Sequence, residues 1–154
     1  MSLILALGSN LGNRKKNIED ALGHLKENFE FIALSKIYES GPVDYLKQPA
    51  FLNCVAEFKL PKQNPQEILK LIQSIEQQMG RVKVIPKGPR LIDIDIIFWA
   101  TEIINYPELI VPHPEWQNRD FVYGPLSELP YIKTIEKKFK IPENRIHSKV
   151  YTKD

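Results

Sequence analysis

The chain has 154 residues, of which 43% are hydrophobic and 26% are charged, and its formal net charge is +2. Abundant apolar residues and a small net charge exclude disorder for most of the chain, and this length suits one domain, expected over residues 1–154. With 21 Lys and Arg against 19 Asp and Glu, little positive charge remains to neutralise duplex phosphates. We therefore do not expect a nucleic-acid partner.

The cysteine content and the N-terminus predict a compartment. Cys54 is the single cysteine, so no internal disulfide can form, which fits a reducing environment. No apolar run approaches the ~18 residues that a membrane span needs. Met1–Leu7 has no basic segment and predicts a first strand, not a signal peptide. We expect a cytoplasmic protein without a membrane partner.

The predicted elements begin with Leu3–Leu7, a short apolar run typical of a strand buried on both faces. A glycine-containing turn follows, and then a helix that begins after Asn13 as N-cap. Phe31–Glu39 predicts a second strand, and Ser40–Pro49 predicts a loop.

The next strand is predicted over Phe51–Leu60, where apolar residues alternate with a mixed face. Asn64 and the proline after it begin a helix that ends at Gly80. After a basic loop, Leu91–Trp99 predicts a fourth strand. A hairpin is expected over 100–111 and a helix over 118–129, interrupted at Gly124-Pro125; beyond Pro130 the pattern is weak.

The order strand, helix, strand, strand, helix, strand matches the βαββαβ arrangement. We therefore predict the α+β class, as a ferredoxin-like sandwich with a C-terminal hairpin and helix extension. In that layout both helices cover one face of the sheet and leave the other face available.

The fourth predicted strand carries two carboxylates at alternate positions. Asp93 and Asp95 point to one face, and their Cα atoms are expected about 6.6–7 Å apart. Two neighbouring buried carboxylates are costly without a cation between them, and Mg²⁺ binds through one or two carboxylates plus substrate phosphates. The competing interpretation is an edge strand with solvated aspartates, because this spacing alone is a weak signal.

Four cationic side chains immediately precede these aspartates: Arg81, Lys83, Lys87 and Arg90. Cations beside a carboxylate–metal site suit a polyphosphate substrate. A solvated charged loop would give the same composition. Together, the loop and the aspartates favour nucleotide chemistry.

Phe51 and Asn53 lie on the face of their strand opposite the apolar one. An aromatic ring beside an amide can stack on a flat heterocycle and hydrogen-bond its edge. A second small core beneath the loops is the alternative explanation for the same residues.

Five motifs follow one another along the chain. They are Gly8-Ser9-Asn10-Leu11-Gly12, Phe51-Leu52-Asn53, Gly88-Pro89-Arg90-Leu91-Ile92-Asp93-Ile94-Asp95, Val111-Pro112-His113-Pro114 and Asn118-Arg119-Asp120-Phe121. In this order they resemble the 6-hydroxymethyl-7,8-dihydropterin pyrophosphokinase family, and the likeness covers about residues 2 to 130.

The resemblance implies an ATP-dependent diphosphokinase of folate biosynthesis. The family transfers the β,γ-pyrophosphate of ATP to the pterin hydroxymethyl oxygen and releases AMP. Two Mg²⁺ ions would bridge the triphosphate and the metal ligands Asp93 and Asp95. We expect a monomer whose partners are these two small substrates; association with other folate-pathway enzymes stays open.

The resemblance also implies roles for individual residues. Phe51 and Phe121 would stack the pterin, Asn53 would bond its ring edge, and Ser40, Pro42 and Val43 would complete that pocket. The residues that match ATP contacts are Gln73, Glu76, Lys83, Arg90, Ile96, His113 and Arg119. Those that match catalytic positions are Arg81, Arg90, Asp93 and Asp95.

The chain departs from the family at two loop positions. Lys87 stands where the family usually has an aromatic residue before Gly-Pro-Arg, and Lys83 replaces a family arginine.

Two alternative functions are compatible with the same sequence features. A single-stranded RNA-binding module can stack bases on sheet aromatics, and a nucleotidyl or glycosyl transferase can use paired aspartates with a metal. Release of AMP from ATP in the presence of the pterin separates all three.

Overall fold

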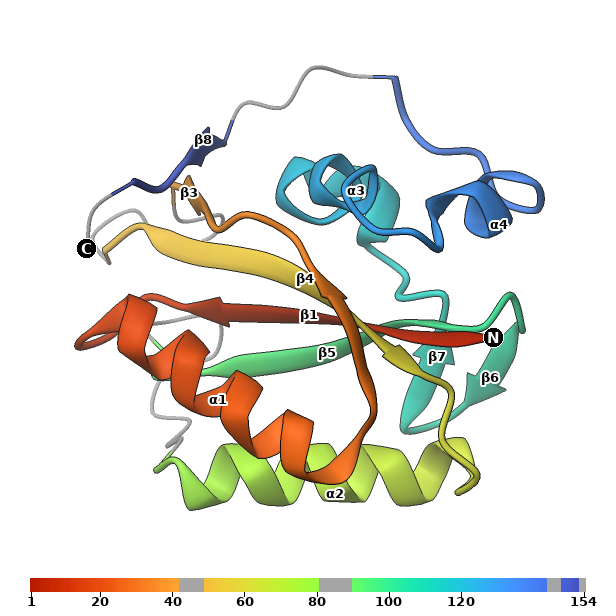
Figure 1. The fold of residues 1–154 in the computed structure, drawn as a ribbon, viewed down its shortest axis with the longest axis horizontal. Helices are drawn as coiled ribbons and strands as arrows, with labels where there is room; N and C mark the ends of the chain where they lie inside the picture. The colour runs from red at the N-terminus through yellow and green to blue at the C-terminus, as the bar shows by residue number, and fades with distance from the viewer. Residues whose placement is uncertain (42–48, 81–89, 144–147, 153–154) are drawn as a thin grey trace.

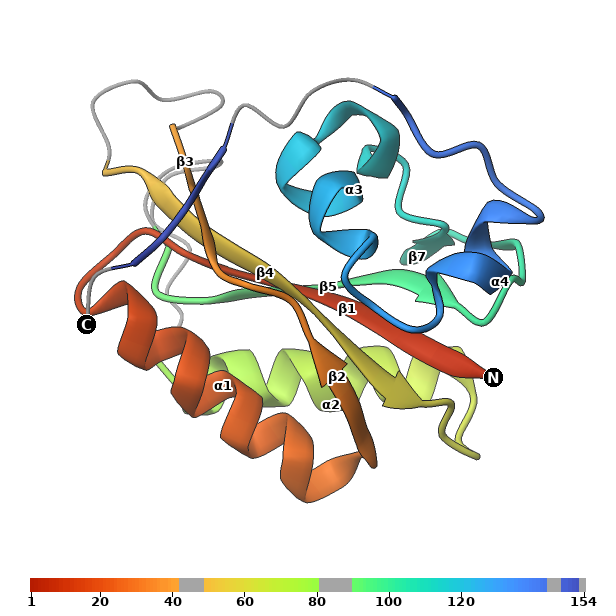
Figure 2. The same ribbon diagram turned by 45° about the horizontal axis from the view of Figure 1, so that its top comes forward.

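The computed structural model describes residues 1–41, 49–80, 90–143 and 148–152. Figures 1 and 2 show an antiparallel sheet with helices on both faces, which is a mixed α/β chain. The strands are β1 (Ser2–Ser9), β2 (Phe31–Leu34), β3 (Tyr38–Ser40), β4 (Phe51–Lys59), β5 (Asp93–Trp99), β6 (Ile104–Tyr106), β7 (Leu109–Val111) and β8 (Lys149–Val150). The helices are α1 (Arg14–Asn28), α2 (Pro65–Gln78), the 3₁₀ turn η1 (Trp116–Asn118), α3 (Asp120–Leu126) and α4 (Ile132–Glu136).

The main sheet has the strand order β5-β1-β4-β3-β8, and β2 also pairs with β4. Every pairing in it is antiparallel. Gly8 of β1 lies opposite Asn53 of β4 on one side and Asp93 of β5 on the other. One row across the sheet therefore joins the two strands that carry the predicted site residues.

Helices α1 and α2 cover one face of this sheet (Figure 1). The N-cap side chains predicted for both helices are confirmed: Asn13 accepts the Lys16 N–H and Asn64 accepts the Glu67 N–H. The predicted apolar face of β4 is confirmed too, since Leu52, Cys54, Ala56 and Phe58 are fully buried against these helices. Burial raises the pKa of the Cys54 thiol to about 12, so this residue is inert core.

The prediction that the second face stays available is only partly right. Helices α3 and α4 cover one half of it (Figure 2) and form a second core with Ile4, Val55 and Phe98. Glu57 lies buried in this layer, where it accepts hydrogen bonds from the Ser2 hydroxyl at 2.8 Å and from the Tyr131 N–H at 3.0 Å. The other half of the face, around Gly8 and Asn53, borders a pocket.

Two predicted elements differ in the structure. The strand expected over Phe31–Glu39 is divided into β2 and β3, because the hydroxyl of buried Ser35 accepts the Val55 N–H that a regular ladder would pair with main chain. The helix expected to break at Gly124-Pro125 continues through both as α3. Pro125 is next to the last helical residue, where it removes one helix hydrogen bond at most.

The hairpin expected over 100–111 is confirmed as the pair β6 and β7.

In the part of the chain that the structure describes, every helix is too short or too polar to span a bilayer.

Candidate active site

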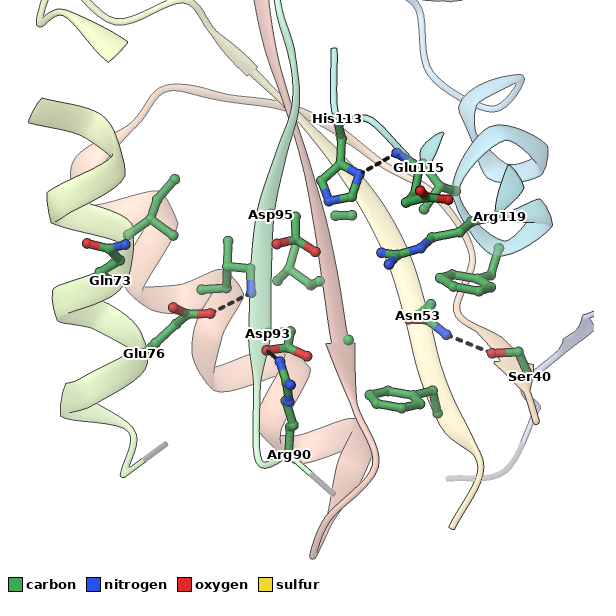
Figure 3. A pocket seen from close by; sticks show the side chains of 18 of the residues that line it. Ser40, Asn53, Gln73, Glu76, Arg90, Asp93, Asp95, His113, Glu115 and Arg119 are labelled. Atoms are coloured by element: carbon green, nitrogen blue, oxygen red, sulfur yellow. Dashed lines mark hydrogen bonds and ion pairs between the residues drawn. The ribbon is translucent and has the colours of Figure 1, made fainter. Parts of the chain in front are cut away.

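A cavity of about 1240 Å³ lies over the uncovered half of the second sheet face. The C-terminal end of β1 and the N-terminal ends of β4 and β5 line it. Helix α2 lines it on one side, and η1 and α3 line it on the other. Figure 3 shows polar side chains from these separate elements pointing into the same space.

Asp93 and Asp95 point from β5 into this cavity, as the alternation predicts. Asp93 Oδ1 lies 3.3 Å from the Arg90 guanidinium, and their side chains are only 23% and 17% exposed. Among the described residues, no group of three or more His, Cys, Asp or Glu is arranged to hold a metal. A cation bound by the two aspartates would complete its shell with water or ligand oxygens, which suits Mg²⁺.

Helix α2 lies beside the free edge of β5 and supplies the wall formed by Gln73 and Glu76 (Figure 3). The Glu76 carboxylate accepts the Ile94 N–H at 2.9 Å, so it satisfies a main-chain donor at this edge. The opposite wall includes residues after β7, and His113 and Arg119 point toward Asp95 (Figure 3).

His113 is held in one tautomer by its surroundings. Its Nδ1 accepts the Glu115 N–H at 3.1 Å, which leaves Nε2 to carry the proton of the neutral ring. Burial lowers the pKa of His113 below 6.5; Asp95 opposes this shift and Arg119 adds to it. The imidazole therefore faces the cavity as a neutral donor near pH 7.

The aromatic part of the cavity lies where β4 meets α3. Phe51 and Phe121 both line it, and Asn53 lies between β1 and β3. Asn53 Nδ2 donates to the Ser40 hydroxyl at 3.0 Å (Figure 3). A Cβ atom at Gly8 would lie 2.8 Å from Asn53 Oδ1, so glycine at this position makes room for the amide.

The structure brings most of the predicted site residues into this one cavity. They are Ser40, Phe51, Asn53, Gln73, Glu76, Arg90, Asp93, Asp95, His113, Arg119 and Phe121. Ile96 is different, because its side chain is 4% exposed and packs in the core under α1 and α2. Pro42, Val43, Arg81, Lys83 and Lys87 lie outside the described residues, and their assignments stay predictions.

Sequence reasoning missed Glu115, Asn118 and Gln77, which also line the cavity. Gln77 is one turn beyond Gln73, and Asn118 adjoins Arg119, so helical spacing and the motif itself were usable signals. The glycine-containing turn predicted after the first strand includes Asn10, which is fully buried and whose side chain bonds both Arg90 and Pro49.

Known proteins resemble this chain over most of its length. The family described as 7,8-dihydro-6-hydroxymethylpterin-pyrophosphokinase (HPPK) matches residues 4–131. The chain is 41% identical over 127 residues to the 2-amino-4-hydroxy-6-hydroxymethyldihydropteridine pyrophosphokinase of Bacillus subtilis, covering 81% of this chain and 75% of that protein. With the protein of the same name from Aquifex aeolicus, identity is 38% over 151 residues, covering 94% of this chain and 93% of that one.

Longer proteins contain a related segment. The chain is 43% identical over 129 residues to the folic acid synthesis protein fol1 of Pneumocystis carinii, covering 83% of this chain but only 17% of that protein. The chain therefore spans less than a fifth of that relative. A crystal structure of Plasmodium falciparum HPPK-DHPS shares the fold, with a TM-score of 0.63, 16% identity, and coverage of 94% of this chain and 42% of that one.

Proposed function

The chain belongs to the 7,8-dihydro-6-hydroxymethylpterin-pyrophosphokinase family, and we propose that it transfers the pyrophosphoryl group of ATP to 6-hydroxymethyl-7,8-dihydropterin. The hydroxymethyl oxygen bonds to the β-phosphorus, the bond from that phosphorus to the α,β-bridging oxygen breaks, and AMP leaves with the electron pair. The hydroxyl proton is released. The observation that carries this proposal is one cavity that combines the Asp93 and Asp95 pair with an aromatic and amide wall.

Transfer of this kind requires positioning and charge stabilisation more than covalent work by the protein. Asp93 and Asp95 would hold two Mg²⁺ ions together with phosphate oxygens of ATP. When bound, the metal supplies positive charge that stabilises the triphosphate. Arg90 would exchange part of its ion pair with Asp93 for a phosphate oxygen, because its guanidinium already points into the same cavity.

The pterin would occupy the aromatic side of the cavity. Phe51 and Phe121 offer stacking surfaces from different elements. The Asn53 amide is held by Ser40 through its nitrogen, so its oxygen is oriented to accept from an N–H of the ring edge. This arrangement supports recognition of a flat heterocycle that carries donors on one edge.

ATP would lie along the free edge of β5, between α2 and the segment after β7. Gln73, Glu76, His113 and Arg119 surround that space. A contact from Ile96 would come from its main chain, because its side chain is buried in the core. Arg81 keeps its sequence-based catalytic assignment and Lys83 its sequence-based assignment as an ATP contact.

We also propose the ferredoxin-like classification and a link to further folate enzymes. The strand order β5-β1-β4 followed by β3 supports the first. Relatives in which this segment is a minor part of a longer folic acid synthesis protein support the second.

A substrate pair tests the proposed reaction. 6-Hydroxymethyl-7,8-dihydropterin should give AMP with ATP and Mg²⁺, whereas 6-methyl-7,8-dihydropterin should bind without AMP release, because it lacks the accepting oxygen. Equal AMP release with both compounds, or none with either, would reject pyrophosphoryl transfer to this pterin. RNA binding without AMP release would favour the RNA-binding alternative.

A further inference from the structure

The described end of the chain contacts β3 and α3, two elements that carry residues lining the cavity, without lining the cavity itself. Strand β8 pairs with β3, with Val150 opposite Tyr38 and Lys149 opposite Glu39. The Tyr151 N–H donates to the Ile37 carbonyl at 2.8 Å and extends this pairing. Strand β8 is the last strand of the sheet, next to β3 (Figure 1). This segment lies beyond the residues that the family comparison matches, which end at 131.

The same segment also contacts the start of α3. The Ser148 N–H donates to Asp120 Oδ2 at 2.8 Å, and the Ser148 hydroxyl lies 3.4 Å from Asp120 Oδ1. Asp120 is the first residue of α3 and stands between Arg119 and Phe121. Both neighbours line the cavity, whereas Asp120 does not. Its carboxylate thus connects the cavity wall to the C-terminal segment.

Helix α3 depends on such contacts for its position. It has seven residues, contains Pro125, and has no side-chain capping hydrogen bond from Arg119. A helix this short is marginal by itself, so tertiary contacts must hold it. Near the other end of α3, Glu128 accepts hydrogen bonds from the Lys36 N–H and the Tyr38 hydroxyl.

Strand β3 is the second element near the cavity that the C-terminal segment contacts. It carries Ser40, whose hydroxyl accepts from Asn53 at 3.0 Å, and it pairs with β4 through Tyr38 and Asn53. Residues 148–151 therefore touch both the strand that orients Asn53 and the helix that carries Phe121.

We propose that the C-terminal segment is a positioning element of the pterin site, and that Asp120 and Ser148 are its positioning residues. Their hydrogen bonds hold Arg119 and Phe121 opposite Asn53. The identity of the substrate rests on the proposed function; the positioning of α3 does not.

Pterin affinity of the full chain, measured by calorimetry with a non-hydrolysable ATP analogue present, tests this role. Asp120→Ala should bind the pterin about tenfold more weakly, because a hydrogen bond to a charged acceptor is lost. Affinity for the ATP analogue should fall less, because Arg119 is the only ATP residue assigned here that adjoins Asp120, whereas Gln73, Glu76 and His113 lie on other elements. Asp120→Asn keeps an oxygen that can accept the Ser148 N–H and should recover most of the loss. Asp20→Ala, on the exposed side of α1, is the matched control.

Wild-type pterin affinity in Asp120→Ala, an equal loss for both ligands, or no recovery in Asp120→Asn would overturn the proposal. If Asp120→Ala does not fold, Ser148→Pro removes the donor N–H from the other side and should give the same pattern.

Hydrogen exchange separates this proposal from the proposed function. The Val122 and Tyr123 amides donate to the Arg119 carbonyl in the first turn of α3. These two amides should exchange faster in Asp120→Ala than in Asp20→Ala, even if the wild-type protein neither binds the pterin nor releases AMP. Unchanged exchange at both amides would reject the positioning role whatever the outcome of the activity assay.

Discussion

Asn10 holds Arg90 through both its side chain and its main chain. Its Oδ1 accepts the Arg90 N–H at 2.6 Å, and its own N–H donates to the Arg90 carbonyl at 3.0 Å. Its Nδ2 donates to the Pro49 carbonyl at 3.2 Å, and the residue is fully buried. One side chain after β1 therefore fixes the approaches to β4 and β5, which carry the pterin wall and the carboxylate pair.

Replacing this side chain should weaken both stability and activity. Asn10→Ala leaves the Arg90 N–H and the Pro49 carbonyl without the amide, at about 1–3 kcal/mol for an unsatisfied buried group. Urea unfolding should show this loss, and turnover should fall as Arg90 shifts. Asn28→Ala, where an exposed amide bonds the His24 carbonyl, is the control. Equal stability of the two variants would contradict the role assigned to Asn10.

The glycine in the floor of the cavity gives a second prediction. Gly8→Ala places a Cβ 2.8 Å from Asn53 Oδ1, which must displace the amide from its position beside Ser40. We expect a loss of pterin affinity with little change in ATP affinity, measured by calorimetry. Gly23→Ala is the matched control, since nothing lies within 4 Å of a Cβ there. That change should stabilise α1 by roughly 0.5–1 kcal/mol. Unchanged pterin affinity in Gly8→Ala would show that Asn53 does not hydrogen-bond the pterin ring.

The carboxylate pair should be required for chemistry and not for folding. Asp93→Asn and Asp95→Asn each remove one charge without creating a cavity, so the thermal midpoint should stay close to that of the wild type. We expect turnover to fall by about 10²–10³-fold, the loss typical for one preorganised charge-stabilising group. Glu102→Gln, on the exposed turn after β5, should retain activity. Near wild-type turnover of both Asp variants at saturating Mg²⁺ would eliminate the metal-holding role.

His113 gives a prediction for pH. Burial lowers its pKa below 6.5 in the folded protein, so the unfolded chain binds this proton more readily. The contribution of His113 to the free energy of unfolding is therefore complete above the unfolded-state pKa of about 6.5. It is lost as the pH falls toward the pKa of His113 in the folded protein, which is lower. His113→Asn keeps an acceptor for the Glu115 N–H but cannot titrate, so its urea midpoint should fall less between about pH 7.5 and 5.5. Parallel profiles for wild type and variant would show that His113 does not contribute.

Local patterns predicted the elements in which each face carries side chains of one kind. Alternation in β4 gave the correct core face, and the spacing of Asp93 and Asp95 gave the shared direction of the carboxylates. The N-caps Asn13 and Asn64 marked the helix starts because their hydrogen bonds are local.

Long-range contacts account for what the patterns missed. The break between β2 and β3 depends on Ser35 meeting Val55, which is twenty residues away. Helices α3 and α4 cover the second face through packing on Ile4, Val55 and Phe98, and the Tyr131 N–H donates to buried Glu57 across 74 residues. No local window contains both partners of either contact, so periodicity could not predict them.

The products of the reaction, observed by ³¹P NMR with ATP, Mg²⁺ and 6-hydroxymethyl-7,8-dihydropterin, test the central claim most directly. Our account predicts equal amounts of AMP and a pterin diphosphate, with both new pterin phosphorus signals derived from the β- and γ-phosphates of ATP. Formation of ADP with a pterin monophosphate, or loss of ATP without a phosphorylated pterin, would contradict pyrophosphoryl transfer.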